Sequence, residues 1–174
     1  MRFCALVAGA VALAGLTAAT SFGRTGGSIG RVGCQQSLTP MNPGIGSNKL
    51  GMRLVLGRVW LPISLRTTWR PEPARLAKVQ DPGIKHGMVV TAGPSVVVEV
   101  PNALRGLLAL NYGTGGPRVA DGQVSDRFTP CPKADGDVTV WAGFYRVKGP
   151  VCARLTVHAG GRVATVSFAL GRPC

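Results

Sequence analysis

The chain has 174 residues and a formal net charge of +13, and 45% of its residues are hydrophobic. This apolar content excludes a wholly disordered chain, and the 25 glycines and 13 prolines favour short strands joined by turns over long helices. The basic residues are spread from Arg24 to Arg172 without a run of four, which favours a generally cationic surface over a site for a specific anionic ligand.

The N-terminal segment, residues 1–19, has the form of a secretory signal peptide. Arg2 supplies a positive charge, residues 3–19 are almost all apolar or small, and Thr-Ala-Ala at 17–19 suits a signal peptidase. We therefore expect export, with cleavage near Ala19. The alternative is an uncleaved membrane anchor, which is disfavoured because alanine and glycine contribute little to membrane insertion.

Beyond the signal peptide, the sequence predicts a Gly-, Ser- and Pro-rich arm (20–50) and one domain (51–174). In the domain, β-branched and apolar runs alternate with turn residues at intervals of about 8–12 residues. On the last of these runs, Val163, Val166 and Phe168 are expected to share a buried face with Leu170, with a slip in the alternation near Thr165. The expected strands, in chain order, are 52–61, an edge continuation at 63–69, 88–90, 96–100, 107–112, 124–128, 138–145, 151–157 and 163–170. Residues 74–79 fit either one helical turn or a short strand.

This order of elements predicts an all-β fold. Many short strands with no long helix after the signal peptide are typical of an antiparallel, Ig-like β-sandwich, here cross-linked by disulfides. A small β-barrel is the alternative.

Four of the five cysteines follow the signal peptide: Cys34, Cys131, Cys152 and Cys174. An even number in an exported chain indicates a disulfide framework, for which three connectivities exist. Cys152 opens one predicted strand and Cys174 follows the next, so an antiparallel hairpin turning at 160–161 brings both to the same end. Cys131 ends an earlier strand at the opposite end. This order favours Cys152–Cys174 and, by elimination, Cys34–Cys131.

The sequence contains no GxSxG, SxxK or HExxH pattern and no spacing typical of zinc ligands. His86 lies in a Gly-rich loop and His158 precedes a Gly-Gly turn, so both are expected to be solvent-exposed turn residues. The acids Asp121, Asp126, Asp135 and Asp137 also lie in turn-like contexts. We therefore assign no catalytic, metal-binding or cofactor-binding residue. A hydrolase site built from either histidine and a nearby acid is the alternative.

One cluster of residues suggests a ligand-binding surface, because aromatic and basic side chains alternate closely there. An exposed group of this kind could stack on sugar rings or bind an anionic polymer. The opposing interpretation is that two of the three aromatic rings point inward and belong to the core. The cluster comprises Trp141, Phe144, Tyr145, Arg146 and Lys148.

The C-terminal third contains FTPCP at 128–132, WAGF at 141–144, GPVC at 149–152 and a closing FALGRPC. In this spacing it resembles a group of small secreted or membrane-associated proteins of actinobacteria. The resemblance covers about fifty residues. It implies an exported protein with structural cysteines, and it implies no activity.

Together these features predict a secreted or cell-envelope-associated protein that acts as a non-enzymatic binding or interaction module. The expected partner is an envelope protein or an anionic wall polymer. No cofactor, no nucleic acid and no membrane span after signal cleavage are expected. An envelope hydrolase is the alternative function, and an accessory domain without a ligand is the third.

Overall fold

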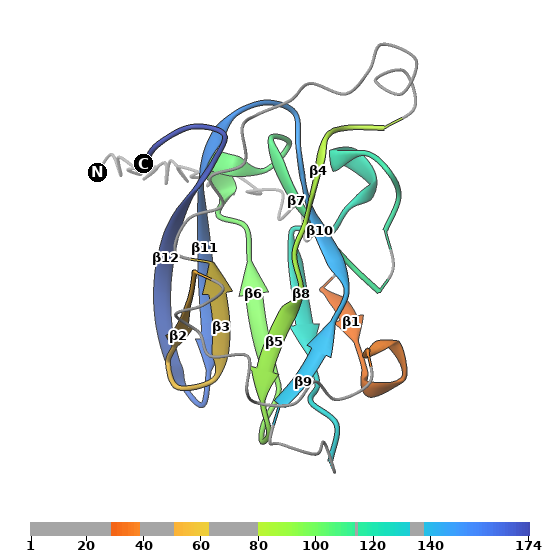
Figure 1. The fold of residues 1–174 in the computed structure, drawn as a ribbon, viewed down its shortest axis with the longest axis vertical. Helices are drawn as coiled ribbons and strands as arrows, with labels where there is room; N and C mark the ends of the chain where they lie inside the picture. Colours follow the sequence, from red (N-terminus) through yellow and green to blue (C-terminus); the bar gives the residue numbers. More distant parts are fainter. Residues whose placement is uncertain (1–28, 39–50, 63–79, 114, 133–137) are drawn as a thin grey trace, which may run out of the picture.

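The computed structural model describes residues 29–38, 51–62, 80–113, 115–132 and 138–174 (Figure 1). These residues form twelve β-strands and three short 3-10 helices, with no α-helix among them. The predicted all-β fold is therefore confirmed. The signal peptide, most of the arm, and the predicted segments 63–69 and 74–79 lie outside the described residues. The 3-10 helices are η1 (Cys34–Gln36), η2 (Asn102–Leu104) and η3 (Val119–Asp121).

The first layer of the fold is a five-stranded sheet in the order β1-β8-β6-β11-β12. Its strands are β1 (Gly30–Val32), β6 (Val96–Glu99), β8 (Ser125–Phe128), β11 (Val151–Ala159) and β12 (Arg162–Leu170). All neighbours are antiparallel except β1 and β8, which run parallel. β11 and β12 form the hairpin that the sequence predicts. Gly160 and Gly161 make its turn at φ 55° and 74°, a backbone region that glycine enters without steric cost.

The second layer consists of two shorter sheets, β2-β3-β5-β9 and β4-β10-β7. Their strands are β2 (Met52–Val55), β3 (Val59–Pro62), β4 (Gly83–Lys85), β5 (Met88–Thr91), β7 (Leu108–Tyr112), β9 (Val138–Trp141) and β10 (Gly143–Val147). β4 continues into β5 after His86 and Gly87, and β9 continues into β10 after Ala142. The two interrupted strands stay paired, and the His86 N–H donates to the Gly143 carbonyl at 3.0 Å across the break. A Cβ at position 143 would overlap the Tyr112 ring, which explains the glycine there.

Two expected strands differ from the structure. The predicted strand at 52–61 is a hairpin of β2 and β3, in which Leu56 and Gly57 have φ of 53° and 69° and the Arg58 N–H donates to the Val55 carbonyl at 2.9 Å. A leucine in the left-handed region is uncommon, so the sequence held little signal for this turn. The predicted strand at 138–145 is divided between β9 and β10.

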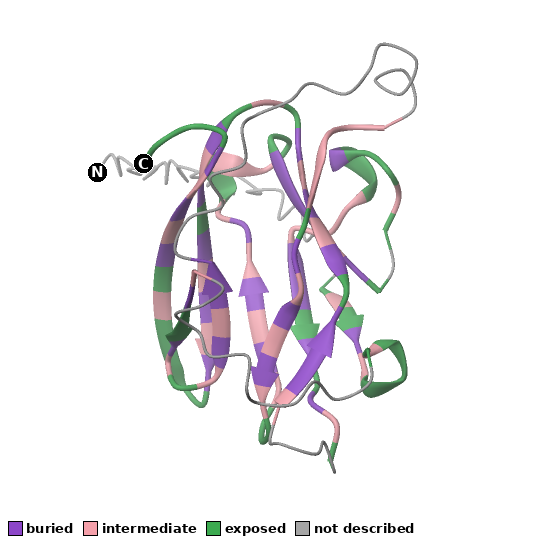
Figure 2. Cartoon of the chain, in the orientation of Figure 1, coloured by how far each residue is buried: buried purple, intermediate pink, exposed green. Residues whose placement is uncertain are grey.

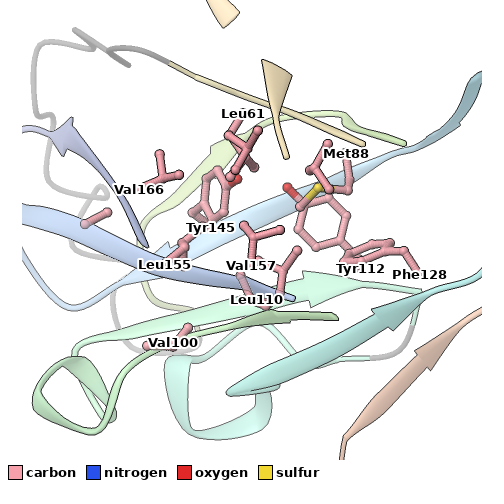
Figure 3. Packing of buried hydrophobic residues seen from close by; sticks show 14 of the residues in the cluster. Leu61, Met88, Val100, Leu110, Tyr112, Phe128, Tyr145, Leu155, Val157 and Val166 are labelled. Carbon is pink, nitrogen blue, oxygen red and sulfur yellow. The ribbon is translucent and has the colours of Figure 1, made fainter. Parts of the chain in front are cut away.

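The two layers face each other across one apolar core and, in the described part of the chain, do not close into a barrel (Figures 1 and 3). The expected sandwich is thus confirmed. Buried and more exposed residues alternate along β10, β11 and β12 (Figure 2). Val166, Phe168 and Leu170 are buried as predicted, but Val163 is 60% exposed. The register of β12 against β11 is unbroken, so strict alternation turns Val163 outward.

Residues 29–38, which belong to the predicted arm, connect the two layers along one side. β1 extends the first layer beside β8, and the bridge between Leu38 and Val140 reaches β9 in the second layer. The Leu38 N–H donates to the Val140 carbonyl at 2.7 Å, and the indole Nε1 of Trp141 donates to the Gly33 carbonyl at 2.9 Å. This strand was not expected from the composition of the arm.

Both predicted disulfides are present, Cys34–Cys131 and Cys152–Cys174. The reasoning from strand order also holds: β8 and β11 both run antiparallel to β6, so Cys131 after β8 lies at the end opposite Cys152. One bridge fastens the arm to the first layer, and the other fastens the C-terminal tail to the start of β11.

Candidate functional site

The structure separates the predicted aromatic and basic surface into core and surface residues. Trp141 and Tyr145 are fully buried, while Phe144 is half-buried and Lys148 is exposed. Arg146 stacks its guanidinium carbon 4.8 Å from the centre of the Phe144 ring. Alternation along β10 is the reason, because it turns every second side chain into the core. Two of the three aromatic rings therefore pack inward, and the five residues do not form a single surface.

His86 is buried, contrary to the expectation of an exposed turn residue. Its side chain stacks on Tyr145 with 5.5 Å between ring centres, and Nδ1 has no hydrogen-bond partner. Burial lowers the pKa of His86 to about 4, so the imidazole is neutral at physiological pH. The break between β4 and β5 aims this side chain inward.

His158 lies within β11 and remains partly exposed. Its Nε2 is 3.6 Å from Glu99 Oε2, and Glu99 Oε1 is 3.1 Å from Arg105 Nη2. An acid and a histidine therefore meet on the outer face of the first layer. Within the described residues, neither His86 nor His158 has a hydrogen bond to a hydroxyl group, which a nucleophile of the Ser-His-Asp type would require.

Asp126 is fully buried in β8, contrary to the expectation of a turn residue. Neither carboxyl oxygen has a hydrogen-bond partner, and burial raises the pKa of Asp126 to about 7. The nearby Tyr112 hydroxyl is also buried; burial, the Tyr145 hydroxyl and the Asp126 carboxyl raise its pKa well above the usual value. Gly30 makes room for the carboxyl group, because a Cβ there would overlap Asp126 Oδ1.

We expect Gly30→Ala to lower the free energy of unfolding by about 1–3 kcal/mol, because the new methyl group must displace the buried carboxyl or β1 itself. Urea unfolding measures the loss. Gly33→Ala is the matched control in the same segment, since its new Cβ lies 3.8 Å from the nearest atom, Gln36 Oε1. Equal effects of the two substitutions would contradict the packing of Gly30 on Asp126.

Of the four acidic residues in the described part of the chain, three contact other groups of the protein and the fourth is buried. Asp81 and Asp121 accept backbone N–H groups at the start of η3, at 2.6 and 3.3 Å. Glu99 contacts Arg105 and a histidine, and Asp126 is buried. Few surface carboxylates therefore offset the basic side chains, which concentrates positive potential on the described surface.

An open groove of about 530 Å³ lies beside η2, the start of β11 and the C-terminal tail. Its lining combines apolar side chains with three cations and contains no acid. The volume falls in the range typical of small-molecule sites. The apolar members are Pro101, Ala103, Leu104, Leu107, Pro150 and Val151, and the cations are Lys148, Arg154 and Arg172.

Three different parts of the fold place these cations. Arg154 points outward from β11, because its neighbours in the strand face the core. Arg172 is held at the groove by the Cys152–Cys174 disulfide, and Lys148 follows β10, where its N–H donates to the Leu107 carbonyl at 3.0 Å. None of the three forms an ion pair with any residue that the structure describes.

Of the predicted surface residues, only Lys148 reaches this groove. The sequence analysis did not identify Arg154 and Arg172 as groove residues, although two of its predictions would have indicated their positions. Alternation along β11 turns Arg154 outward, and the predicted Cys152–Cys174 bridge brings the tail to that strand.

The described residues contain neither a candidate metal-binding cluster nor a candidate membrane-spanning helix. They include no group of three or more His, Cys, Asp or Glu side chains placed to hold a metal ion. They also include no helix with the length and hydropathy needed to cross a membrane. The chain matches no protein-family model, no curated protein and no solved structure.

Proposed function

We propose that this chain is an exported protein of the cell envelope that binds an anionic ligand without catalysing a reaction on it. The observation that carries the proposal is the groove at the start of β11, where Lys148, Arg154 and Arg172 converge without a carboxylate. The two disulfides support export, because such bonds persist in oxidising compartments.

Electrostatics explains why this arrangement favours binding of an anion. Cations that have no ion-pair partner among the described residues gain one when a phosphate or carboxylate arrives, and they give up no ion pair with a described residue. The groove also excludes part of the surrounding water, which strengthens each contact relative to a flat surface. Salt should weaken such binding, because a Debye length of about 8 Å at physiological ionic strength screens exposed charges.

The test uses a soluble anionic polymer, poly(glycerol phosphate), with neutral dextran as the uncharged probe. We expect the mature protein to bind the anionic polymer at about 20 mM salt, to lose most affinity at about 300 mM, and to ignore dextran. Arg154→Gln combined with Arg172→Gln should raise Kd about tenfold, or about 1.4 kcal/mol. Isothermal titration calorimetry measures each Kd.

Arg31→Gln combined with Arg127→Gln is the matched control. These two arginines are exposed on β1 and β8, outside the groove. Replacing both removes the same amount of charge as replacing Arg154 and Arg172. The Kd of this control should rise less than about twofold, which is the effect of net charge alone. Equal weakening by both pairs would locate binding elsewhere, and absence of binding by the unmodified protein would refute the function.

A further inference from the structure

The groove exposes apolar side chains beside its cations. Leu107 is 48% exposed, and Leu104 is half-buried against the core. Both belong to the segment that passes through η2 between β6 and β7, and both line the groove with Lys148, Arg154 and Arg172. A ligand that was only a hydrated anion would leave these leucines in water.

We propose that the groove binds a single-chain anionic amphiphile, with the charged head group against Arg154, Arg172 and Lys148 and the alkyl chain against Leu104 and Leu107. This inference rests on the proposed function, since it names the ligand class of the same site. Charge complementarity selects an anionic head group, because the lining holds three cations and no acid. The volume of about 530 Å³ suits a small molecule with one chain.

The mixed lining also explains selectivity. A neutral amphiphile would cover the leucines and leave the cations without partners, whereas a small anion would pair with the cations and leave the leucines exposed. Only a ligand with both parts uses the whole surface. Each buried methylene group adds favourable transfer free energy, so affinity should rise with chain length until the apolar surface is covered.

Three probes separate the two parts of the ligand: dodecyl phosphate, methyl phosphate and dodecyl maltoside, each titrated below its micelle concentration into the mature, disulfide-bonded protein. We expect dodecyl phosphate to bind at least about tenfold more tightly than either of the others. If dodecyl phosphate bound no more tightly than methyl phosphate, the alkyl chain would have no role and the amphiphile proposal would fail. If dodecyl maltoside bound as tightly as dodecyl phosphate, the head group would have no role, and the amphiphile proposal would fail for that reason.

Two leucine variants test where the alkyl chain of the ligand binds. Leu107→Asn should weaken dodecyl phosphate binding on the order of fivefold and leave methyl phosphate binding unchanged. Leu54→Asn is the control, because Leu54 is 43% exposed on β2 and does not line the groove. An unchanged Kd for dodecyl phosphate in Leu107→Asn would overturn the placement of the alkyl chain. Binding of poly(glycerol phosphate) tests the proposed function separately, since that polymer has no alkyl chain.

Discussion

Replacing Cys34 and Cys131 by serine is expected to lower the free energy of unfolding by about 4–5 kcal/mol, the larger of the two disulfide effects in this chain. The bridge joins residues 97 positions apart, so its loss frees a long loop in the unfolded chain. In the folded state it also holds η1 beside the end of β8. Urea unfolding monitored by far-UV circular dichroism measures the change.

Cys152→Ser combined with Cys174→Ser is the comparison. That bridge spans 22 positions, and the chain-entropy relation gives about 3 kcal/mol for it. Hydrogen exchange adds a local readout, since loss of the Cys34 bridge should speed exchange in β8 and loss of the Cys152 bridge should not. A Cys34–Cys131 variant at least as stable as the Cys152–Cys174 variant would contradict this order.

The parts of the fold that were predictable from the sequence are those governed by local alternation. The period of two along 151–157 and 163–170 and the glycines between them predicted the β11–β12 hairpin, and the hairpin predicted its disulfide. The β2–β3 turn was missed, because Leu56 adopts a positive φ that leucine seldom takes. β1 was missed because a short strand in a Gly-rich arm is stabilised by its partner β8 and by a distant cysteine.

The candidate site was less predictable, since it depends on residues that are distant in the sequence. Lys148, Arg154 and Arg172 meet only after β11 pairs with β12 and the tail is bridged to Cys152. The burial of Asp126 depends on the missing side chain of Gly30 in another strand. The strand predicted at 124–128 contains Asp126, but local sequence could not show that its carboxyl group is buried, because the space for it is provided by Gly30 on another strand.

His86 and Asp126 should give this protein two opposing pH dependences. Between about pH 4 and 6.5 the unfolded chain binds a proton at His86 that the folded chain does not, so stability rises with pH by up to about 3 kcal/mol. Between about pH 3.8 and 7 the folded chain keeps a proton on Asp126 that the unfolded chain releases, so stability falls with pH by up to about 4 kcal/mol. The contributions of these two residues nearly cancel.

Single substitutions should therefore reveal the pH dependence of the free energy of unfolding that each residue contributes. In Asp126→Asn the free energy of unfolding should rise from pH 4 to 6.5, because the Asp126 contribution no longer offsets that of His86. In His86→Phe, which keeps a ring against Tyr145, the free energy of unfolding should fall from pH 4 to 7, because the His86 contribution no longer offsets that of Asp126. Urea titrations across this range measure both slopes, and the double variant removes both residues' contributions as a control. The packing cost of a substitution does not vary with pH, so it does not change the slope of the free energy of unfolding against pH. Equal slopes in the two single variants would therefore contradict a neutral, buried His86 and a protonated, buried Asp126 in the folded chain.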